Sequence, residues 1–292
     1  MFKGSMTALV TPFSGGRIDA EALRRHIDFQ IDNGIDGLVP CGTTGEASTL
    51  THEEHIEVVR ITVEHVNGRV PVIAGSGSNS TEEAARLTLR VKEVGADASL
   101  MITPYYNKPT QEGLYQHFSY VAGKVDIPII LYNVPGRTGV NMLPETVGRL
   151  AGIPNIVGLK DATSDLKQAS YTFQMVPDDF VILSGEDAMV YPLMSIGGRG
   201  VISVVSNIAP RQMADLTGSF LGGDVGKARE LHHRLLPLCD AMFIETNPIP
   251  VKGALFMMGR IKDEFRLPMV PLSEGSRVKL RKTLGEFGIK LS

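Results

Sequence analysis

Residues 128–132 (PIILY) and 156–160 (IVGLK) are short runs of apolar and β-branched side chains, the first ending in a tyrosine and the second in a lysine. Runs that start about 20 to 35 residues apart match the span of one strand-helix unit. Because nearly every residue in them is apolar, they are predicted to be parallel strands buried on both faces. Six more runs of this kind occur at 6–10, 37–40, 70–74, 98–103, 181–184 and 200–204.

Eight strand-helix units in series predict a closed α/β structure, the (β/α)₈ or TIM barrel, with right-handed connections. The segments between the runs carry helix start signals. Asp19 precedes a stretch with helical spacing, and Thr51 followed by Glu54 is a capping box. An open, doubly wound sheet is the alternative, but it requires fewer strands and a reversal of strand order.

The chain after residue 204 shows helical spacing and no further strand pattern. The first expected helix completes the barrel, so residues 1–222 are predicted to form the catalytic barrel. Residues 223–292 are predicted to form a helical extension packed on it. The expected helices span 213–221, 225–243, 250–258 and 273–287.

The composition is that of an ordinary globular chain of 292 residues, 43% hydrophobic and 21% charged. With 29 basic and 32 acidic side chains, the net charge of −3 favours neither nucleic acid nor an anionic membrane as a partner. No apolar run approaches the roughly 18 residues of a membrane span. We therefore expect a cytoplasmic location, also because no signal peptide is evident. Cys41 and Cys239 are expected to be buried thiols.

Functional side chains of such barrels lie at the carboxyl ends of the strands and on the loops that follow. This rule selects Lys160, whose position after an apolar strand predicts a desolvated amine with a lowered pKa, able to form a Schiff base with a carbonyl. A lysine that extends to water is the alternative. The loops selected in this way are 41–46 (CGTTGE), 75–79 (GSGSN), 104–107 (PYYN), 132–139 (YNVPGRTG), 160–163 (KDAT) and 184–187 (SGED).

Four neighbouring groups on these loops suit an anionic keto acid. Tyr132 is placed to shuttle protons, and Arg137 to grip a carboxylate with two hydrogen bonds. Thr43 and Thr44 offer hydroxyl and backbone N–H groups to a carboxylate. A buried aromatic residue, a surface ion pair and a simple turn remain the respective alternatives.

Other chemistries have weak sequence support. His52 and His55 lack the spacing of a zinc-protease helix and a third ligand, so no metal site is predicted. His232 and His233 are expected on a solvated helix face. The glycines of 75–77 and 197–200 do not follow a dinucleotide-binding pattern.

The motifs 42–46 (GTTGE), 103–107 (TPYYN), 132–139 (YNVPGRTG) and 158–161 (GLKD) resemble the dihydrodipicolinate synthase family, within the N-acetylneuraminate lyase and class I aldolase superfamily. The resemblance continues through 247–252 (NPIPVK). It implies a lyase of the diaminopimelate route to L-lysine. Lys160 would form an imine with pyruvate, the derived enamine would add to L-aspartate 4-semialdehyde, and transimination would release Lys160. The family uses no metal or organic cofactor.

The resemblance also implies a role for each matching residue. Tyr132, Thr43 and Tyr106 match a proton relay in which the tyrosine at position 106 enters from a neighbouring subunit, and the usual assembly is a homotetramer, a dimer of dimers. Thr44 matches the residue that holds the pyruvate carboxylate, and Arg137 the one that holds the carboxylate of the semialdehyde. The positions that match the lining of the pyruvate end are Gly185 and Ile202.

Members of the family that are inhibited by L-lysine bind it in a pocket at a subunit interface. Several residues of this chain match the positions that line that pocket. Acceptors such as Glu83 and Tyr105 suit an ammonium group, so inhibition by L-lysine is our hypothesis. The matching positions are His55, Asn79, Glu83 and Tyr105, with Ala47, Ser48 and His52 nearby.

Sister enzymes share the barrel, the lysine and the pyruvate half-reaction: N-acetylneuraminate lyase and the aldolases of 2-keto-3-deoxygluconate and 4-hydroxy-2-oxoglutarate. Arg137 and the loop 105–107 favour a semialdehyde that bears a carboxylate. A metabolite-binding barrel without catalysis is the other alternative, against which stand Lys160 and its tyrosine and threonine neighbours.

Overall fold

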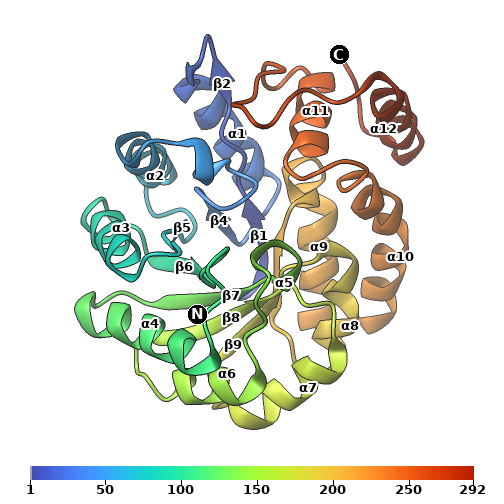
Figure 1. The fold of residues 1–292 in the computed structure, drawn as a ribbon. Helices are drawn as coiled ribbons and strands as arrows, with labels where there is room; N and C mark the ends of the chain where they lie inside the picture. The colour runs from blue at the N-terminus through green and yellow to red at the C-terminus, as the bar shows by residue number, and fades with distance from the viewer. Residues whose placement is uncertain (1) are drawn as a thin grey trace.

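The computed structural model describes residues 2–292, in which eight parallel strands form a barrel surrounded by helices (Figure 1). Each barrel strand pairs with the next along the chain except β4 and β5, which meet through a single bridge, and β10 returns to pair with β1. The strands are β1 (Gly4–Ala8), β4 (Gly37–Val39), β5 (Ile73–Gly75), β6 (Ala98–Ile102), β7 (Ile129–Asn133), β8 (Ile156–Asp161), β9 (Val181–Ser184) and β10 (Gly200–Ser203).

The barrel closes between β4 and β5 through the bridge that pairs Leu38 with Val72. Two backbone hydrogen bonds flank it, from Leu38 N to Pro71 O at 3.0 Å and from Gly75 N to Pro40 O at 2.9 Å. Every strand of the barrel therefore has a neighbour on both sides among the residues that the structure describes. The predicted (β/α)₈ barrel is confirmed, and the open-sheet alternative is wrong.

The strand predicted over 70–74 begins later than expected, because Pro71 has no N–H to donate to a ladder. A small hairpin near the barrel mouth was not predicted. Its strands, β2 (Phe13–Ser14) and β3 (Arg17–Ile18), are joined by Gly15 and Gly16, both with positive φ. The pair Gly15-Gly16 is typical of a two-residue hairpin turn and could have predicted this hairpin.

The barrel helices begin where their caps predict. Asp19 caps α1 through a hydrogen bond from Ala22 N, and Thr51 and Glu54 form the expected capping box of α2. The α-helices are α1 (Ala20–Asp32), α2 (His52–Val66), α3 (Thr81–Glu93), α4 (Gln111–Lys124), α5 (Pro135–Thr138), α6 (Pro144–Ala151), α7 (Leu166–Met175), α8 (Val190–Ser195) and α9 (Pro210–Leu221). Three 3₁₀ turns follow strands: η1 (Ala47–Thr49), η2 (Asp187–Met189) and η3 (Val205–Asn207).

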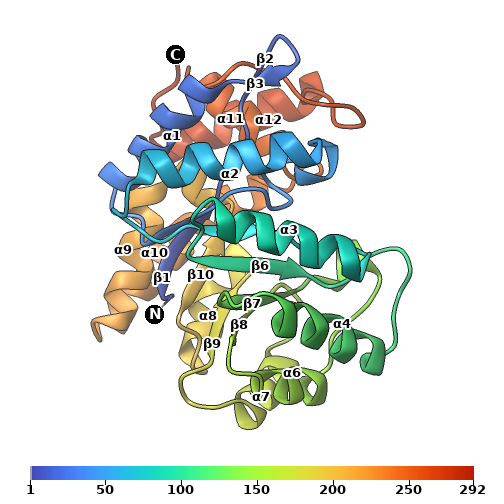
Figure 2. The ribbon, with the colours of Figure 1, turned by 90° about the vertical axis from the view of Figure 1, so that its left-hand side faces the viewer.

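The C-terminal helices lie side by side along one flank of the barrel (Figures 1 and 2). They are α10 (Val225–Ala241), α11 (Ile249–Met257) and α12 (Glu274–Phe287), each within two residues of its predicted bounds. Their buried side chains Leu235, Leu255 and Leu280 join one hydrophobic cluster with Val201 of β10 and Met213 of α9. Barrel and extension therefore share apolar core.

The prediction for His232 is wrong. Its side chain is buried and stacks on Tyr191, with ring centroids 5.7 Å apart, because this face of α10 packs against α8. His233 is exposed as expected. Cys41 and Cys239 are buried free thiols, as predicted.

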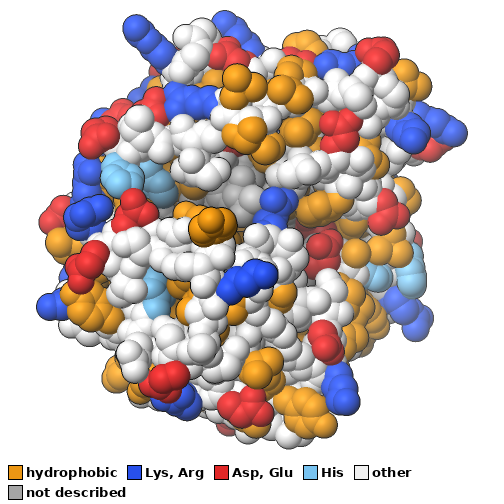
Figure 3. Space-filling model, viewed as in Figure 1, with side chains coloured by type: hydrophobic (Ala, Val, Ile, Leu, Met, Phe, Trp, Pro, Cys, Tyr) orange, Lys and Arg blue, Asp and Glu red, His pale blue; other side chains and the backbone are white. Residues whose placement is uncertain are grey.

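The interior of the barrel is filled by apolar side chains from several strands, including Met6, Ile73, Ile130, Leu183 and Ile202. On the face viewed in Figure 3, basic and acidic side chains are interspersed, without a large field of one sign. No helix within residues 2–292 is long and apolar enough to cross a membrane.

The pairing of β10 with β1 depends on Gly200, which has a φ of 146°. A Cβ atom there would lie 1.9 Å from the Gly4 carbonyl oxygen. We expect Gly200→Ala to lower the free energy of unfolding by about 3 kcal/mol or more, measured by denaturant titration with circular dichroism. Gly123→Ala is the control, because this exposed helical glycine has open space and should gain up to about 1 kcal/mol. Equal stability of the two variants would contradict the prediction.

Candidate active site

Two adjoining cavities lie at the carboxyl ends of the barrel strands. The smaller, of about 120 Å³, is lined by Lys160 and Gly185, and the larger, of about 500 Å³, by His55 and Glu83. The two cavities share one wall, so a ligand in either cavity would lie beside the residues of that wall. That wall is formed by Gly42, Thr43, Leu100, Tyr132 and Arg137.

Lys160 is the last residue but one of β8 and lies opposite Tyr132 of β7 and Leu183 of β9 in the strand register. Its side chain is buried, and this desolvation lowers the pKa of the amine to about 8. Asp187 and Glu186 oppose the shift through their negative charges, whereas Arg137 adds to it. Near pH 8, a large fraction of Lys160 is therefore the neutral, nucleophilic amine.

The ring of Tyr132 lies beside this amine, with the Lys160 Nζ 4.3 Å from the ring centroid. Burial raises the pKa of the Tyr132 phenol to about 12, although Arg137 and a hydrogen bond with Thr43 oppose the shift. Tyr132 therefore stays protonated at neutral pH and can donate a proton inside the cavity.

Thr44 is buried at the edge of the small cavity, and its Oγ1 accepts a hydrogen bond from Asn247 Nδ2 at 3.0 Å. The backbone carbonyl of Asn247 accepts from Arg137 Nη2 at 3.3 Å. Thr11 holds the same loop by donating its hydroxyl to Gly45 O at 2.7 Å. Strand ends and the C-terminal extension thus fix the threonines and the arginine together.

Gly185 packs directly against the reactive lysine. A Cβ atom at this position would lie 2.7 Å from Ala162 Cβ and 3.0 Å from Lys160 Cε. Glycine at this position therefore avoids a close contact with the Lys160 side chain. Ile202, by contrast, lies in the barrel interior with Tyr132 and is not part of the cavity lining.

Sequence reasoning assigned no role to four residues that the structure brings to this site. Phe243 and Asn247 reach it from the extension, and Glu186 lines it after β9. Asp187 is buried, and its Oδ2 accepts from Val204 N at 2.9 Å, while its Oδ1 has no hydrogen-bond partner among residues 2–292. The motifs 184–187 and 247–252 contain the three polar residues among them, so the sequence did offer a signal. The spacing of the motifs could not show that the extension packs against the barrel mouth.

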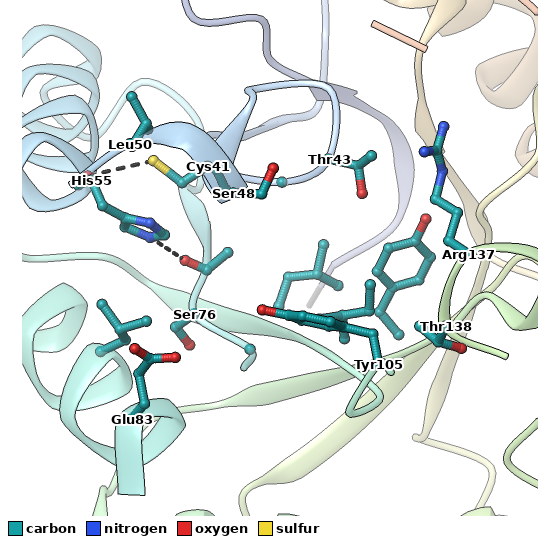
Figure 4. Close-up of a pocket in the computed structure, with 18 of the residues that line it drawn as sticks. Cys41, Thr43, Ser48, Leu50, His55, Ser76, Glu83, Tyr105, Arg137 and Thr138 are labelled. Carbon is teal, nitrogen blue, oxygen red and sulfur yellow. Dashed lines mark hydrogen bonds between the residues drawn. The ribbon is translucent and has the colours of Figure 1, made fainter. Parts of the chain in front are cut away.

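The larger cavity brings together most residues of the predicted effector pocket (Figure 4). His55 Nε2 donates to Gly75 O at 2.7 Å, and burial lowers the pKa of this imidazole. His52 Nε2 lies 3.0 Å from Glu83 Oε1, and Ser78 also hydrogen-bonds this carboxylate and lowers its pKa. The remaining predicted residues in this lining are Ala47, Ser48 and Tyr105.

Besides Ile202, two predicted residues lie outside both cavities. Tyr106 is 89% exposed, with a φ of 73°, and so projects from the surface of this single chain. Asn79 does not line the larger cavity, but its carbonyl accepts a hydrogen bond from Asn107 Nδ2 at 2.9 Å. No group of three or more potential metal-ligating side chains converges within residues 2–292.

A partly neutral lysine at the mouth of a (β/α)₈ barrel, beside a protonated tyrosine, defines the class of enzymes that form Schiff bases with carbonyl substrates. The model of the "Dihydrodipicolinate synthetase family" matches residues 1–287. The chain belongs to this family. It is a Schiff-base-forming lyase, as the sequence motifs predicted.

Individual relatives cover nearly the whole chain. Proteins named 4-hydroxy-tetrahydrodipicolinate synthase from Syntrophus aciditrophicus and Syntrophobacter fumaroxidans are 56% and 57% identical, over 99% of this chain and 99% and 100% of their own lengths. The crystal structure of dihydrodipicolinate synthase from Aquifex aeolicus matches with a TM-score of 0.98 at 48% identity, covering 100% of both chains.

Two further solved structures were described with small molecules. The Acinetobacter baumannii enzyme complexed with pyruvate has a TM-score of 0.97 at 46% identity, covering 99% of this chain and 100% of its own. The Cyanidioschyzon merolae enzyme with lysine bound has a TM-score of 0.96 at 39% identity, covering 99% of both chains.

The lowered pKa of Lys160 predicts when its amine reacts. We expect reductive methylation by formaldehyde and cyanoborohydride, mapped by mass spectrometry at short times, to rise at Lys160 with a midpoint near pH 8. Exposed lysines lack this burial, so their rate of methylation should keep rising at higher pH. They are the internal control in the same digest. A midpoint for Lys160 equal to theirs would contradict the burial argument.

Proposed function

We propose that the enzyme is a 4-hydroxy-tetrahydrodipicolinate synthase, which joins pyruvate, held as an imine on Lys160, to L-aspartate 4-semialdehyde. The observation that carries this proposal is the buried Lys160 amine, with a pKa of about 8, in a cavity of about 120 Å³ beside Tyr132. The names of the full-length relatives support it.

The neutral Lys160 amine adds to the keto carbon of pyruvate to give a carbinolamine, and loss of water leaves the protonated imine. Tyr132, kept protonated by burial, supplies the proton that the departing hydroxyl needs. The imine then acidifies the methyl group, which loses a proton to form an enamine. Thr43, which lines both cavities together with Tyr132, would relay protons between the cavity and the tyrosine.

The enamine carbon attacks the aldehyde carbon of the semialdehyde and forms the new carbon-carbon bond. The amine of that substrate then replaces Lys160 on the imine carbon, which closes the ring and frees the lysine. Thr44 would hold the pyruvate carboxylate, with Gly185 leaving space beside it. Arg137, at the rim shared by both cavities, would hold the carboxylate of the semialdehyde.

L-lysine is the proposed inhibitor, bound in the larger cavity. Its ammonium groups suit the Glu83 carboxylate and the Tyr105 hydroxyl, while His55 is fixed by Gly75 as a neutral wall. Gly42 and Thr43 border both cavities. A ligand in the larger cavity would therefore contact the loop that carries the catalytic Thr43. The lysine-bound relative supports this assignment.

The proposed assembly is a homotetramer built as a dimer of dimers, located in the cytoplasm. The exposed Tyr106 supports it, since an aromatic side chain 89% exposed beside the barrel mouth is well placed to enter the site of a second copy. There it would complete the proton relay of Tyr132 and Thr43.

Borohydride trapping tests the proposed chemistry. We expect reduction in the presence of pyruvate to add the mass of the reduced pyruvate adduct at Lys160, located by peptide mapping. Lys160→Ala should form no adduct while keeping its circular dichroism spectrum, because loss of a side chain at a strand end leaves the barrel core intact. An adduct at another residue, or none in the parent enzyme, would overturn the mechanism.

Arg137→Ala is the control that separates the two half-reactions. It should keep the pyruvate adduct on Lys160 but lose turnover with the semialdehyde by about tenfold or more, since a charge-assisted hydrogen bond is worth about 1.5–3 kcal/mol. Loss of the adduct in this variant would contradict the assigned division of carboxylates.

Inhibition by L-lysine is tested by initial rates. We expect millimolar L-lysine to lower the rate, and Glu83→Gln to raise the inhibitory concentration by about tenfold, because the half-buried acceptor loses its charge. Glu82→Gln is the matched control, since Glu82 is the adjacent residue on α3 but hydrogen-bonds Tyr120 outside the cavity. Rates of the parent unchanged by L-lysine would remove the hypothesis.

A further inference from the structure

Glu46 and Lys252 form a buried ion pair that no step of the reaction uses. Each side chain is only 1% exposed, and the two residues come from the loop after β4 and from α11 of the extension. Lys252 Nζ also donates to Glu264 O at 2.8 Å and lies 4.5 and 4.6 Å from the ring centroids of Phe13 and Phe265. The ammonium therefore occupies a closed site with fixed partners on several sides.

Glu46 closes the loop that carries Thr43 and Thr44. Its backbone is left-handed, with a φ of 52°, and its second carboxylate oxygen accepts from Arg266 N at 3.2 Å. Both oxygens of Glu46 are thus bound by the extension. The position of this end of the loop is set by the C-terminal segment, more than 200 residues away in sequence.

The same extension holds the loop at a second point. Asn247, just before α11, donates to Thr44 Oγ1 and accepts from Arg137. Lys252 lies near the start of α11, only five residues after Asn247. This short segment is therefore attached to the loop at two points, Thr44 and Glu46. Movement of α11 would displace the Thr44 hydroxyl with it.

We propose that Lys252, paired with Glu46, is a positioning residue for Thr44, which binds the carboxylate of the keto acid. This inference rests on the proposed role of Thr44. A buried pair of charges stabilises a fold little more than apolar side chains of the same size do, but its directional hydrogen bonds fix a geometry. Its loss therefore loosens the threonine loop and weakens substrate binding, while the chemistry at Lys160 is retained.

The test uses the double variant Glu46→Gln/Lys252→Met, which removes both charges and keeps the approximate side-chain size. The readout is the pyruvate concentration that gives half-maximal borohydride trapping at Lys160, measured well below the melting temperature. We expect that concentration to rise roughly tenfold, with the trapping rate at saturating pyruvate nearly unchanged. Lys252→Met alone leaves Glu46 buried without its partner, so the double variant is the one that keeps the test valid if the single variant does not fold.

Arg277→Met is the matched control, because it removes another ion pair of the extension, from Arg277 to Asp263 at 2.8 Å, and leaves the hydrogen bonds of Lys252 and Glu46 in place. It should lower the melting temperature without changing half-saturation. An unchanged half-saturation in the double variant overturns the proposal, and so does an equal rise in Arg277→Met. If the parent itself gives no adduct at Lys160, the proposed function fails instead.

Discussion

The strand register at the barrel mouth is the constraint on which the site depends. Tyr132 of β7 lies opposite Lys160 of β8, so both side chains leave their strands at the same level and on the same side. In a parallel barrel the carboxyl ends of all strands meet at one rim, and the loops that follow them converge there. A shift of one residue in either strand would send one of the two side chains to the opposite face.

Burial then gives these two groups opposite protonation states. It disfavours the charged form of each, so the amine of Lys160 becomes a weaker base and the phenol of Tyr132 a weaker acid. A nucleophile without its proton and an acid with one are what imine formation needs. The carboxylates of Glu186 and Asp187 oppose part of the shift at Lys160 and can stabilise the positive charge of the imine that follows.

The C-terminal extension is part of this machinery as well as of the core. It supplies Asn247 to Thr44 and Arg137, Phe243 to the cavity wall, and Lys252 to the threonine loop. Gly185 adds a steric condition, because a Cβ atom there would crowd Ala162 and the Lys160 side chain. The site is therefore held from the barrel below and from the extension at its side.

The sequence by itself determined the strand order, the helix starts at Asp19 and Thr51, and the strand ends that carry Lys160 and Tyr132, because these follow from local apolar patterns and capping chemistry. It could not place Asn247, Lys252 or the buried face of His232. Those positions depend on contacts between segments up to about 200 residues apart, which no local pattern encodes. Only the tertiary structure decided them, since packing of the extension on the barrel chooses which polar groups are desolvated together and which remain in water.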